Sequence, residues 1–302
     1  KIPERAYSSK RNYILINFMY DVEYAGILLS LNNYNNNFSR VSKNQFLESI
    51  KTLKSYYPVL DNWEASPEAF HPKEVFNFRL KMNKIISDLY STKKVNQDKH
   101  AEKYLLDNLE ICKKNNLSHY TLANHLRYLG RFYKLNLRDD KKVIQYLTKA
   151  IEIAKNHPII QNEPAYPSML GDIAHSYWHL GEFEKGYPFS KLAVEISLKR
   201  LNKIIPTKHL LSDNYELEEA KKRMETHNKI LFGMIFYSDQ SINWDQKKFF
   251  EMASESFENG QLLPSLETAQ AMSHLKVKIE TNDYDLMHYY KNKNKIESDI
   301  FN

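Results

Sequence analysis

The sequence of 302 residues has little glycine, one cysteine and few prolines. Seven glycines and ten prolines are too few for the tight turns of an all-β fold or for the glycine-rich loops of a nucleotide-binding α/β fold. The single cysteine, Cys112, excludes an intramolecular disulfide and a cysteine-based zinc site. Because Cys112 lies among apolar residues at helical spacing, we expect a buried, inert thiol. The scarcity of turn-forming residues predicts an all-α fold.

Catalytic motifs are also missing. The sequence has no Gly-x-x-x-x-Gly-Lys phosphate loop, no Gly-x-Gly-x-x-Gly, no Gly-x-Ser-x-Gly and no His-Glu-x-x-His. Acidic residues are plentiful, but their spacing brings no pair together. We therefore predict a non-enzymatic protein with no catalytic residues and no cofactor. The alternative is a catalytic site assembled from distant residues, which motif analysis does not detect.

The charge balance is mildly basic. Lysine and arginine number 43 and aspartate and glutamate 37, a net charge of +6, but the two signs are interspersed along the chain. This indicates only a weak preference for acidic partners. A basic cluster at Lys199, Arg200, Lys203, Lys208 and 221–223 could contact a phosphate backbone. The sequence shows no DNA-binding helix-turn-helix motif, no RNA-recognition motif and no zinc finger, so a nucleic-acid partner is predicted to be unlikely.

One long apolar stretch covers residues 13–31. Asn17, Asp21 and Glu23 interrupt it, and an acidic residue at the centre of a span costs about 2.5–3.5 kcal/mol on insertion. We therefore expect a buried helix of a soluble protein and no membrane span. The first residue is Lys1 rather than methionine, so we expect that a targeting segment was removed or that the chain was trimmed. The compartment stays open between a processed mitochondrial protein and a bacterial one.

Helix start signals recur along the chain. Ser42 and Gln45 form a capping box that predicts a helix over 43–57, and Pro72 suits the first turn of a helix to residue 90. Further helices are predicted from start signals and apolar spacing over 213–237, 243–258 and 283–300. Three segments are predicted to be irregular connectors: 32–39, 58–72 and 199–213.

The most informative segment, 126–196, reads as two successive helix–turn–helix units. The second helices of successive pairs begin their small-residue contacts at Ala101, Val143 and Gly186, so the period is 42 and then 43 residues. That period is longer than the 34 residues of a standard tetratricopeptide unit. Units of this kind cannot bury their apolar face alone, and they stack into solenoids that usually bind other molecules.

The second unit resembles a tetratricopeptide repeat. The resemblance rests on small residues at the helix crossing and on the turn 180–183, with the matching residues Ala174, Tyr177, Gly186 and Ala193. The first unit matches at Leu129, Gly130, Tyr133, Leu147 and Ala150, with a turn about one residue longer near 138–140 and with Val143 where a small residue is usual. The resemblance implies a right-handed superhelix of antiparallel helix pairs. We predict an N-terminal helical cap over 1–70, a repeat core over 71–200 and a C-terminal region over 201–302 that continues the superhelix.

In the resembled family, side chains of the first helices line a concave groove. Asn124, Arg127, Arg131 and Lys134 recur at helical intervals and form a polar, basic stripe on the first helix of the first unit. A comparable asparagine and basic set can clamp a peptide carboxylate there, since guanidinium groups bind carboxylates through two hydrogen bonds. The alternative is an ordinary solvated face.

The second unit adds His175, Trp178 and His179 to the predicted groove. The two histidines lie one helical turn apart and could chelate a metal, but a catalytic zinc needs three protein ligands. We predict no metal site and expect two polar residues that face the groove. Trp178 could anchor a partner or pack in the core, and the sequence leaves both interpretations open.

These features predict a scaffold or adaptor that binds protein or peptide partners, including acidic segments, as a subunit of a larger assembly. The alternative is a peptide-sensing regulatory receptor. The segment 282–290 is similar to the C-terminal repeats of helical-repeat peptide receptors of bacteria and their phages. Those receptors often carry an N-terminal DNA-binding domain, and residues 1–60 show none.

Overall fold

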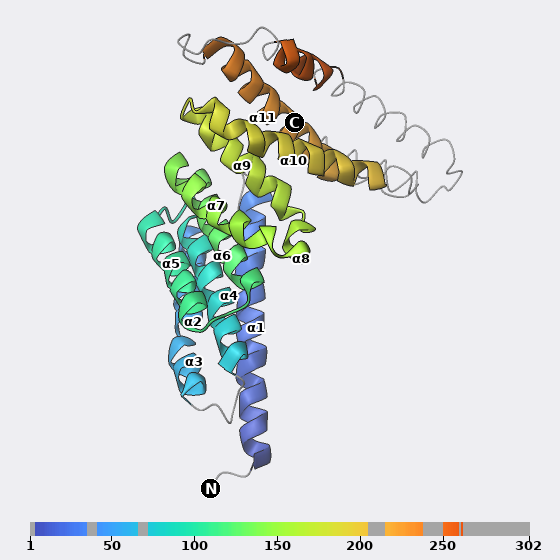
Figure 1. The fold of residues 1–302 in the computed structure, drawn as a ribbon. Coiled ribbons are helices and arrows are strands. Elements are labelled where there is room, and N and C mark those ends of the chain that lie inside the picture. Colours follow the sequence, from blue (N-terminus) through green and yellow to red (C-terminus); the bar gives the residue numbers. More distant parts are fainter. Residues whose placement is uncertain are drawn as a thin grey trace, which may run out of the picture. The chain divides into compact units, whose positions relative to one another are not determined.

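The computed structural model describes residues 4–34, 41–65, 72–204, 215–237, 250–259 and 261, and every regular element in those ranges is helical. The predicted all-α class is therefore confirmed for this part of the chain. Contacts divide the chain into a first unit, which ends at Asn162, and a second unit, which begins at Glu163 (Figure 1). Each unit is described by itself. The boundaries expected at residues 70 and 200 stay predictions.

The first unit consists of antiparallel helices joined by short connections. Neighbours in the sequence also pack in space: α4 lies against α5, α5 against α6, and α6 against α7. The elements are α1 (Glu4–Tyr34), α2 (Lys43–Lys54), α3 (Tyr57–Glu64), α4 (Pro72–Tyr90), α5 (Asp98–Lys114), α6 (His119–Phe132), η1 (Tyr133–Leu137), α7 (Asp140–Lys155) and α8 (Pro158–Gln161).

The α6–α7 pair shows why the first repeat fits together. Gly130 faces Leu147 so closely that a Cβ atom at Gly130 would lie 2.4 Å from Leu147 Cδ2. The additional residue predicted in the turn is accommodated by the π-helical turn η1, followed by Arg138 in the left-handed region at φ 51°. Asp139 then caps α7 by accepting a hydrogen bond from the Lys142 backbone nitrogen at 3.0 Å.

The second unit repeats the same helix-pair arrangement. Its helices are α9 (Ala165–His179), α10 (Phe183–Ile204), α11 (Tyr215–Tyr237) and the helical residues 250–259. The turn between α9 and α10 contains Gly181 at φ 72°, a conformation that favours glycine. Gly186 lets α10 approach α9, because a Cβ atom there would lie 3.0 Å from Tyr177 Cβ and 3.3 Å from the Ala174 oxygen. The predicted crossing and turn of this unit are confirmed.

Local start signals were reliable, but connector predictions were less so. The capping box at Ser42 and Gln45 is present, although α2 ends at Lys54 rather than at residue 57. The prediction of an irregular 58–72 is wrong for its first part, because Pro58 occupies the first turn of α3 and starts a helix there. Likewise α10 continues to Ile204, into the segment predicted to be a linker. The predictions for 35–39, 205–213, 243–249 and 283–300 concern segments that lie outside the described residues.

The buried-thiol prediction is confirmed. Cys112 lies on α5 and is 2% exposed. Burial raises the pKa of its thiol to about 11, because the thiolate would lose its hydration. The residue therefore acts as a small apolar side chain of the first unit's core.

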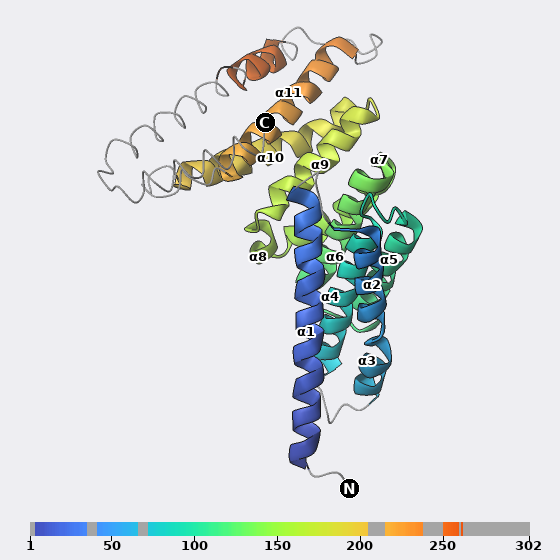
Figure 2. The same ribbon diagram turned by 180° about the vertical axis from the view of Figure 1, so that it is seen from behind.

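Helix α1 corrects the expectation of a buried N-terminal helix. One of its faces packs against α2 and α4, where Phe18 makes edge contacts with the rings of Tyr56 and Phe78 at 5.2 and 5.5 Å. Many of the large apolar side chains on the other faces of α1 are exposed. Figure 2 shows α1 along one side of α2 and α4. By length and composition alone, residues 13–32 could cross a membrane, and they form the single stretch of this kind among the described residues.

Candidate functional site

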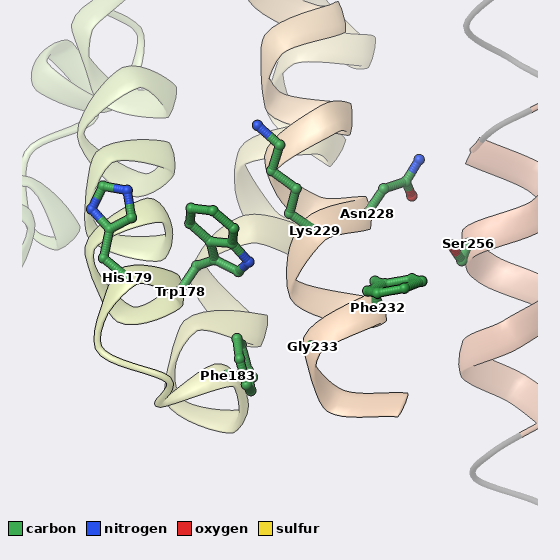
Figure 3. A pocket seen from close by; sticks show the side chains of 8 residues that line it. All are labelled: Trp178, His179, Phe183, Asn228, Lys229, Phe232, Gly233 and Ser256. Atoms are coloured by element: carbon green, nitrogen blue, oxygen red, sulfur yellow. The ribbon is translucent and has the colours of Figure 1, made fainter. Parts of the chain in front are cut away.

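A cavity of about 690 Å³ opens in the second unit where the end of α9, the start of α10, α11 and the helical residues 250–259 meet. That volume lies within the range of ordinary ligand pockets. Figure 3 shows the side chains around it. The lining residues are Trp178, His179, Phe183, Asn228, Lys229, Phe232, Gly233 and Ser256. The sequence had singled out Trp178 and His179 as groove residues and Phe183 as part of the repeat turn; the others come from α11 and from 250–259, which no motif connects to them.

Aromatic side chains form the apolar walls of this cavity. Trp178 is partly buried and packs against the core cluster that contains Ala174 and Ile230, while it also lines the cavity. The ammonium of Lys229 lies 5.7 Å from the centre of the indole ring, a cation–π distance. Trp178 thus combines both roles that the sequence left open, packing in the core and facing the opening.

A close backbone approach fixes the second wall. The Phe183 ring lies so near Gly233 that a Cβ atom at Gly233 would be 2.4 Å from Phe183 Cδ1. Any larger residue at position 233 would push the ring away from α11. Phe232, the next residue, is 52% exposed and lies on the side of α11 that faces Ser256 in Figure 3. The cavity therefore has a rigid wall at Phe183 and an accessible one at Phe232.

The described polar groups of the cavity are an amide, an ammonium, an imidazole and a hydroxyl. Asn228 Oδ1 is buried and has no hydrogen-bond partner within the described residues. Lys229 and His179 are both exposed, and none of the lining residues that the structure describes is an aspartate or glutamate. An unsatisfied buried acceptor is costly to the fold. The charge at the opening favours a negative group nearby.

The two predicted histidines of α9 pack against each other. Their ring centroids are 4.2 Å apart in an edge-on arrangement, and His175 lies 5.6 Å from the ring centre of Trp178. Within the described ranges, no group of three or more histidine, cysteine, aspartate or glutamate side chains gathers as a metal site. The imidazoles extend the aromatic surface beside the cavity.

The basic stripe of α6 lies in the first unit and disperses in three dimensions. The Arg127 guanidinium stacks 4.9 Å from the Tyr128 ring centre, and Asn124 and Lys134 are half-buried outside the cavities described. Arg131 lines a second cavity, of about 530 Å³, between α1, α4 and α6. The four residues thus do not form one clamp.

That second cavity is predominantly basic. Lys84, Lys93 and Arg131 contribute cations, while Asp88 contributes a carboxylate that pairs with Lys84. Behind it, burial and the nearby Lys84 charge lower the pKa of His125 to about 4, so the imidazole is neutral at pH 7. The stripe of α6 and the aromatic cavity of α9 belong to different units, so each is a separate candidate surface.

A buried polar chain joins three helices of the second unit, and sequence analysis missed it. Ser190 Oγ lies 2.7 Å from His227 Nδ1, and His227 Nε2 lies 3.1 Å from Glu255 Oε1. The Ser190 hydroxyl is 1% exposed and donates to the Tyr187 carbonyl at 2.9 Å. Burial lowers the pKa of His227, although Glu255 opposes this. An enclosed hydroxyl cannot reach a substrate, so these hydrogen-bonded side chains hold the three helices together and do not form a nucleophile.

Two arginines of the predicted basic cluster are used inside the second unit. Arg223 is 3% exposed, pairs with Glu219 and donates to Ser168 Oγ at 3.0 Å. Arg200 donates to the Glu163 carbonyl at 2.7 Å. These guanidinium groups are therefore not presented to a phosphate backbone. The side chains of Lys203 and Lys208 lie outside the described residues.

Within the described residues, successive helices pack as pairs, with close crossings at Gly130 and Gly186. Solved structures similar to the chain are the nearly identical TPR-like repeats of a kinesin light chain of Podosopora anserina, at 15% identity and TM-score 0.49, covering 85% of this chain and 96% of that one. A single-residue variant of that protein is 15% identical with a TM-score of 0.48, and the match covers 84% of this chain and 98% of that one. BtubC (BKLC) from P. vanneervenii is 12% identical with a TM-score of 0.43, and the match covers 79% of this chain and 93% of that one. No protein-family model matches the chain, and no curated protein matches its sequence.

Proposed function

We propose that this chain is a non-enzymatic scaffold that binds a segment of a partner protein in the aromatic cavity of its second unit. The observation that carries this proposal is a cavity of about 690 Å³ lined by Trp178, Phe183 and Phe232, with Lys229 and no acid among the described lining residues. Aromatic anchors in desolvated pockets dominate binding energy at protein interfaces. The rest of the helix stack supplies a rigid support for them.

The chemistry of the lining defines the partner segment. A bulky apolar side chain would fill the space between the aromatic walls, and an adjacent aspartate or glutamate would lie near Lys229 and His179. Asn228, on the same wall, contributes the one side-chain amide among the described lining residues and can hydrogen-bond the backbone of the segment. The basic cavity beside Arg131 offers a second contact for acidic residues. Assembly into a larger complex follows from this mode of binding and is part of the proposal.

The test is selection of short displayed peptides on the immobilised full chain. We expect enrichment of a bulky apolar residue flanked by aspartate or glutamate. Phe232→Ala should weaken binding about tenfold or more, since removal of an anchor costs more than about 1.4 kcal/mol. Phe257→Ala is the matched control, because Phe257 is a similarly exposed phenylalanine outside the cavity lining.

Charge reversal tests the second half of the proposal. Lys229→Glu should shift the selected peptides from acidic to basic flanking residues. Unchanged selection in both Phe232→Ala and Lys229→Glu would refute the cavity as the binding site. Tight binding of one short peptide, with no larger protein partner, would favour the peptide-sensing alternative over a scaffold.

A further inference from the structure

Helix α1 has two apolar faces, and only one of them is packed. The packed face includes Phe18, Val22, Ala25 and Leu28, each less than 5% exposed. The opposite face carries six large apolar side chains that are between 41% and 68% exposed. We name this face the outer stripe; its members are Tyr13, Ile16, Tyr20, Tyr24, Ile27 and Leu31. A soluble protein does not need this second face to complete its own core.

The outer stripe follows an 11-residue repeat. Its spacings of three, four, four, three and four residues place Tyr24 eleven positions after Tyr13, and Ile27 eleven after Ile16. An 11-residue repeat has about 3.67 residues per turn, close to the 3.6 of a straight helix. The stripe therefore stays on one side of α1 for about 27 Å. A surface of this form fits a second long helix along its whole length.

The stripe is also nearly symmetric about Val22. If a second α1 lies antiparallel to the first with a twofold axis at that position, Tyr13 meets Leu31, Ile16 meets Ile27 and Tyr20 meets Tyr24. Every large side chain then faces another apolar one. Self-complementarity of this kind is the requirement for a twofold interface between identical chains.

The area of the stripe suits a dimer. With the exposed fractions above, three tyrosines and three aliphatic residues present on the order of 500 Å² per chain. Two copies would bury about 1,000 Å², which is the lower end of specific interfaces. Tyrosine is also enriched at such interfaces.

The charges beside the stripe argue against a membrane surface. Between residues 13 and 31 the charged residues are Asp21 and Glu23, and there is no lysine or arginine. Helices that lie on anionic membranes carry basic polar faces. Asp21 also accepts a hydrogen bond from the Tyr56 hydroxyl at 2.6 Å, a contact that insertion into a bilayer would break.

From these observations we propose that two copies of this chain associate through the outer stripe of α1, packed as an antiparallel helix pair. This dimer is independent of the partner-binding cavity, which lies in the second unit. It would place two identical binding cavities in one particle.

The first experiment is sedimentation velocity on the full chain over a range of concentrations. We expect a dimer, and we expect the double variant Ile16→Glu/Ile27→Glu to sediment as a monomer with unchanged helical content. Ile159→Glu is the matched control, an exposed isoleucine of the first unit that lies outside α1, and it should remain dimeric. A monomeric wild type at every concentration would overturn the proposal.

The second experiment works even if the double variant unfolds. Chains carrying Tyr20→Cys are mixed with differently tagged chains carrying Tyr24→Cys and oxidised, and mixed disulfide-linked pairs should exceed like pairs. Excess like pairs of Tyr13→Cys would instead mean parallel packing and would overturn the arrangement. Two further outcomes would contradict the dimer. One is a monomeric chain that sediments with phosphatidylserine vesicles. The other is a monomeric chain in which Ile16→Glu lowers the Tm, because this would mean that the chain itself covers the outer stripe.

Discussion

Two glycines of the first unit provide a direct test of the helix-pair packing. Gly130 lies inside α6 and Gly26 inside α1, so replacement by alanine improves helix propensity at both by about 1 kcal/mol. Their surroundings differ. A Cβ atom at Gly130 would lie 2.4 and 2.5 Å from Leu147 Cδ2 and Cγ, whereas one at Gly26 meets nothing within 4 Å. The difference between the two variants therefore measures the packing alone.

The magnitude follows from the position of Leu147. This side chain is 1% exposed and has little room to move, so Gly130→Ala overpacks the α6–α7 contact at a cost of about 1–3 kcal/mol. After the gain in propensity, Gly130→Ala should destabilise the first unit by about 1 kcal/mol. Gly26→Ala should stabilise it by about 0.5–1 kcal/mol. We expect a gap of about 2 kcal/mol between the two variants.

Urea denaturation followed by far-ultraviolet circular dichroism measures this gap, provided that the slope of the transition is unchanged. A double-mutant cycle locates its origin: Leu147→Ala should cost less in the Gly130→Ala background than in the wild type, because the clash is already relieved. The packing described for α6 and α7 is wrong if Gly130→Ala stabilises the chain as much as Gly26→Ala does.

Three further predictions concern buried titratable groups. The pKa of His125 is about 4 in the folded chain and near 6.5 in the unfolded chain. The contribution of the neutral imidazole to the free energy of unfolding is therefore fully present above pH 6.5 and falls by about 3 kcal/mol as the pH drops to 4. Denaturation of His125→Phe at a series of pH values should lack this fall, and a profile like that of the wild type would contradict the prediction. Arg223→Met leaves Glu219 half-buried and unpaired, so the second unit should lose about 3 kcal/mol in denaturation, partly recovered in Arg223→Met/Glu219→Met; equal loss in both variants would argue against the pair. Cys112 should not react with a thiol reagent at pH 8 until urea unfolds the chain, and rapid reaction of the native protein would disprove its burial.

Local sequence signals predicted the local structure well. Ser42 and Gln45 form their capping box because the interaction needs only three residues and no distant partner. Gly181 forms the turn after α9 because its positive φ is a property of one residue. Gly130 and Leu147 were both identified as repeat positions from the sequence, and the structure shows that they meet at the helix crossing.

The sequence predicted less of the candidate site. Trp178 was found because it lies within a repeat, but Phe232 and Lys229 come from α11, about fifty residues later, where no motif records their position. The basic stripe of α6 illustrates the opposite error. Arg127 and Arg131 share a helical face in the sequence, yet Arg127 stacks on Tyr128 whereas Arg131 lines the basic cavity of the first unit. Helical spacing gives the direction of a side chain but not its neighbours.

The sequence by itself determined the helical class, the crossing of the repeat helices, the buried state of Cys112 and the 11-residue spacing of apolar residues in α1. These properties depend on composition, on single-residue conformations and on periodicity along one helix. Only the tertiary structure decided which face of α1 is covered, where Arg223 finds its acid and which side chains enclose the aromatic cavity. Those outcomes depend on contacts between segments far apart in the chain, and a one-dimensional pattern does not specify them.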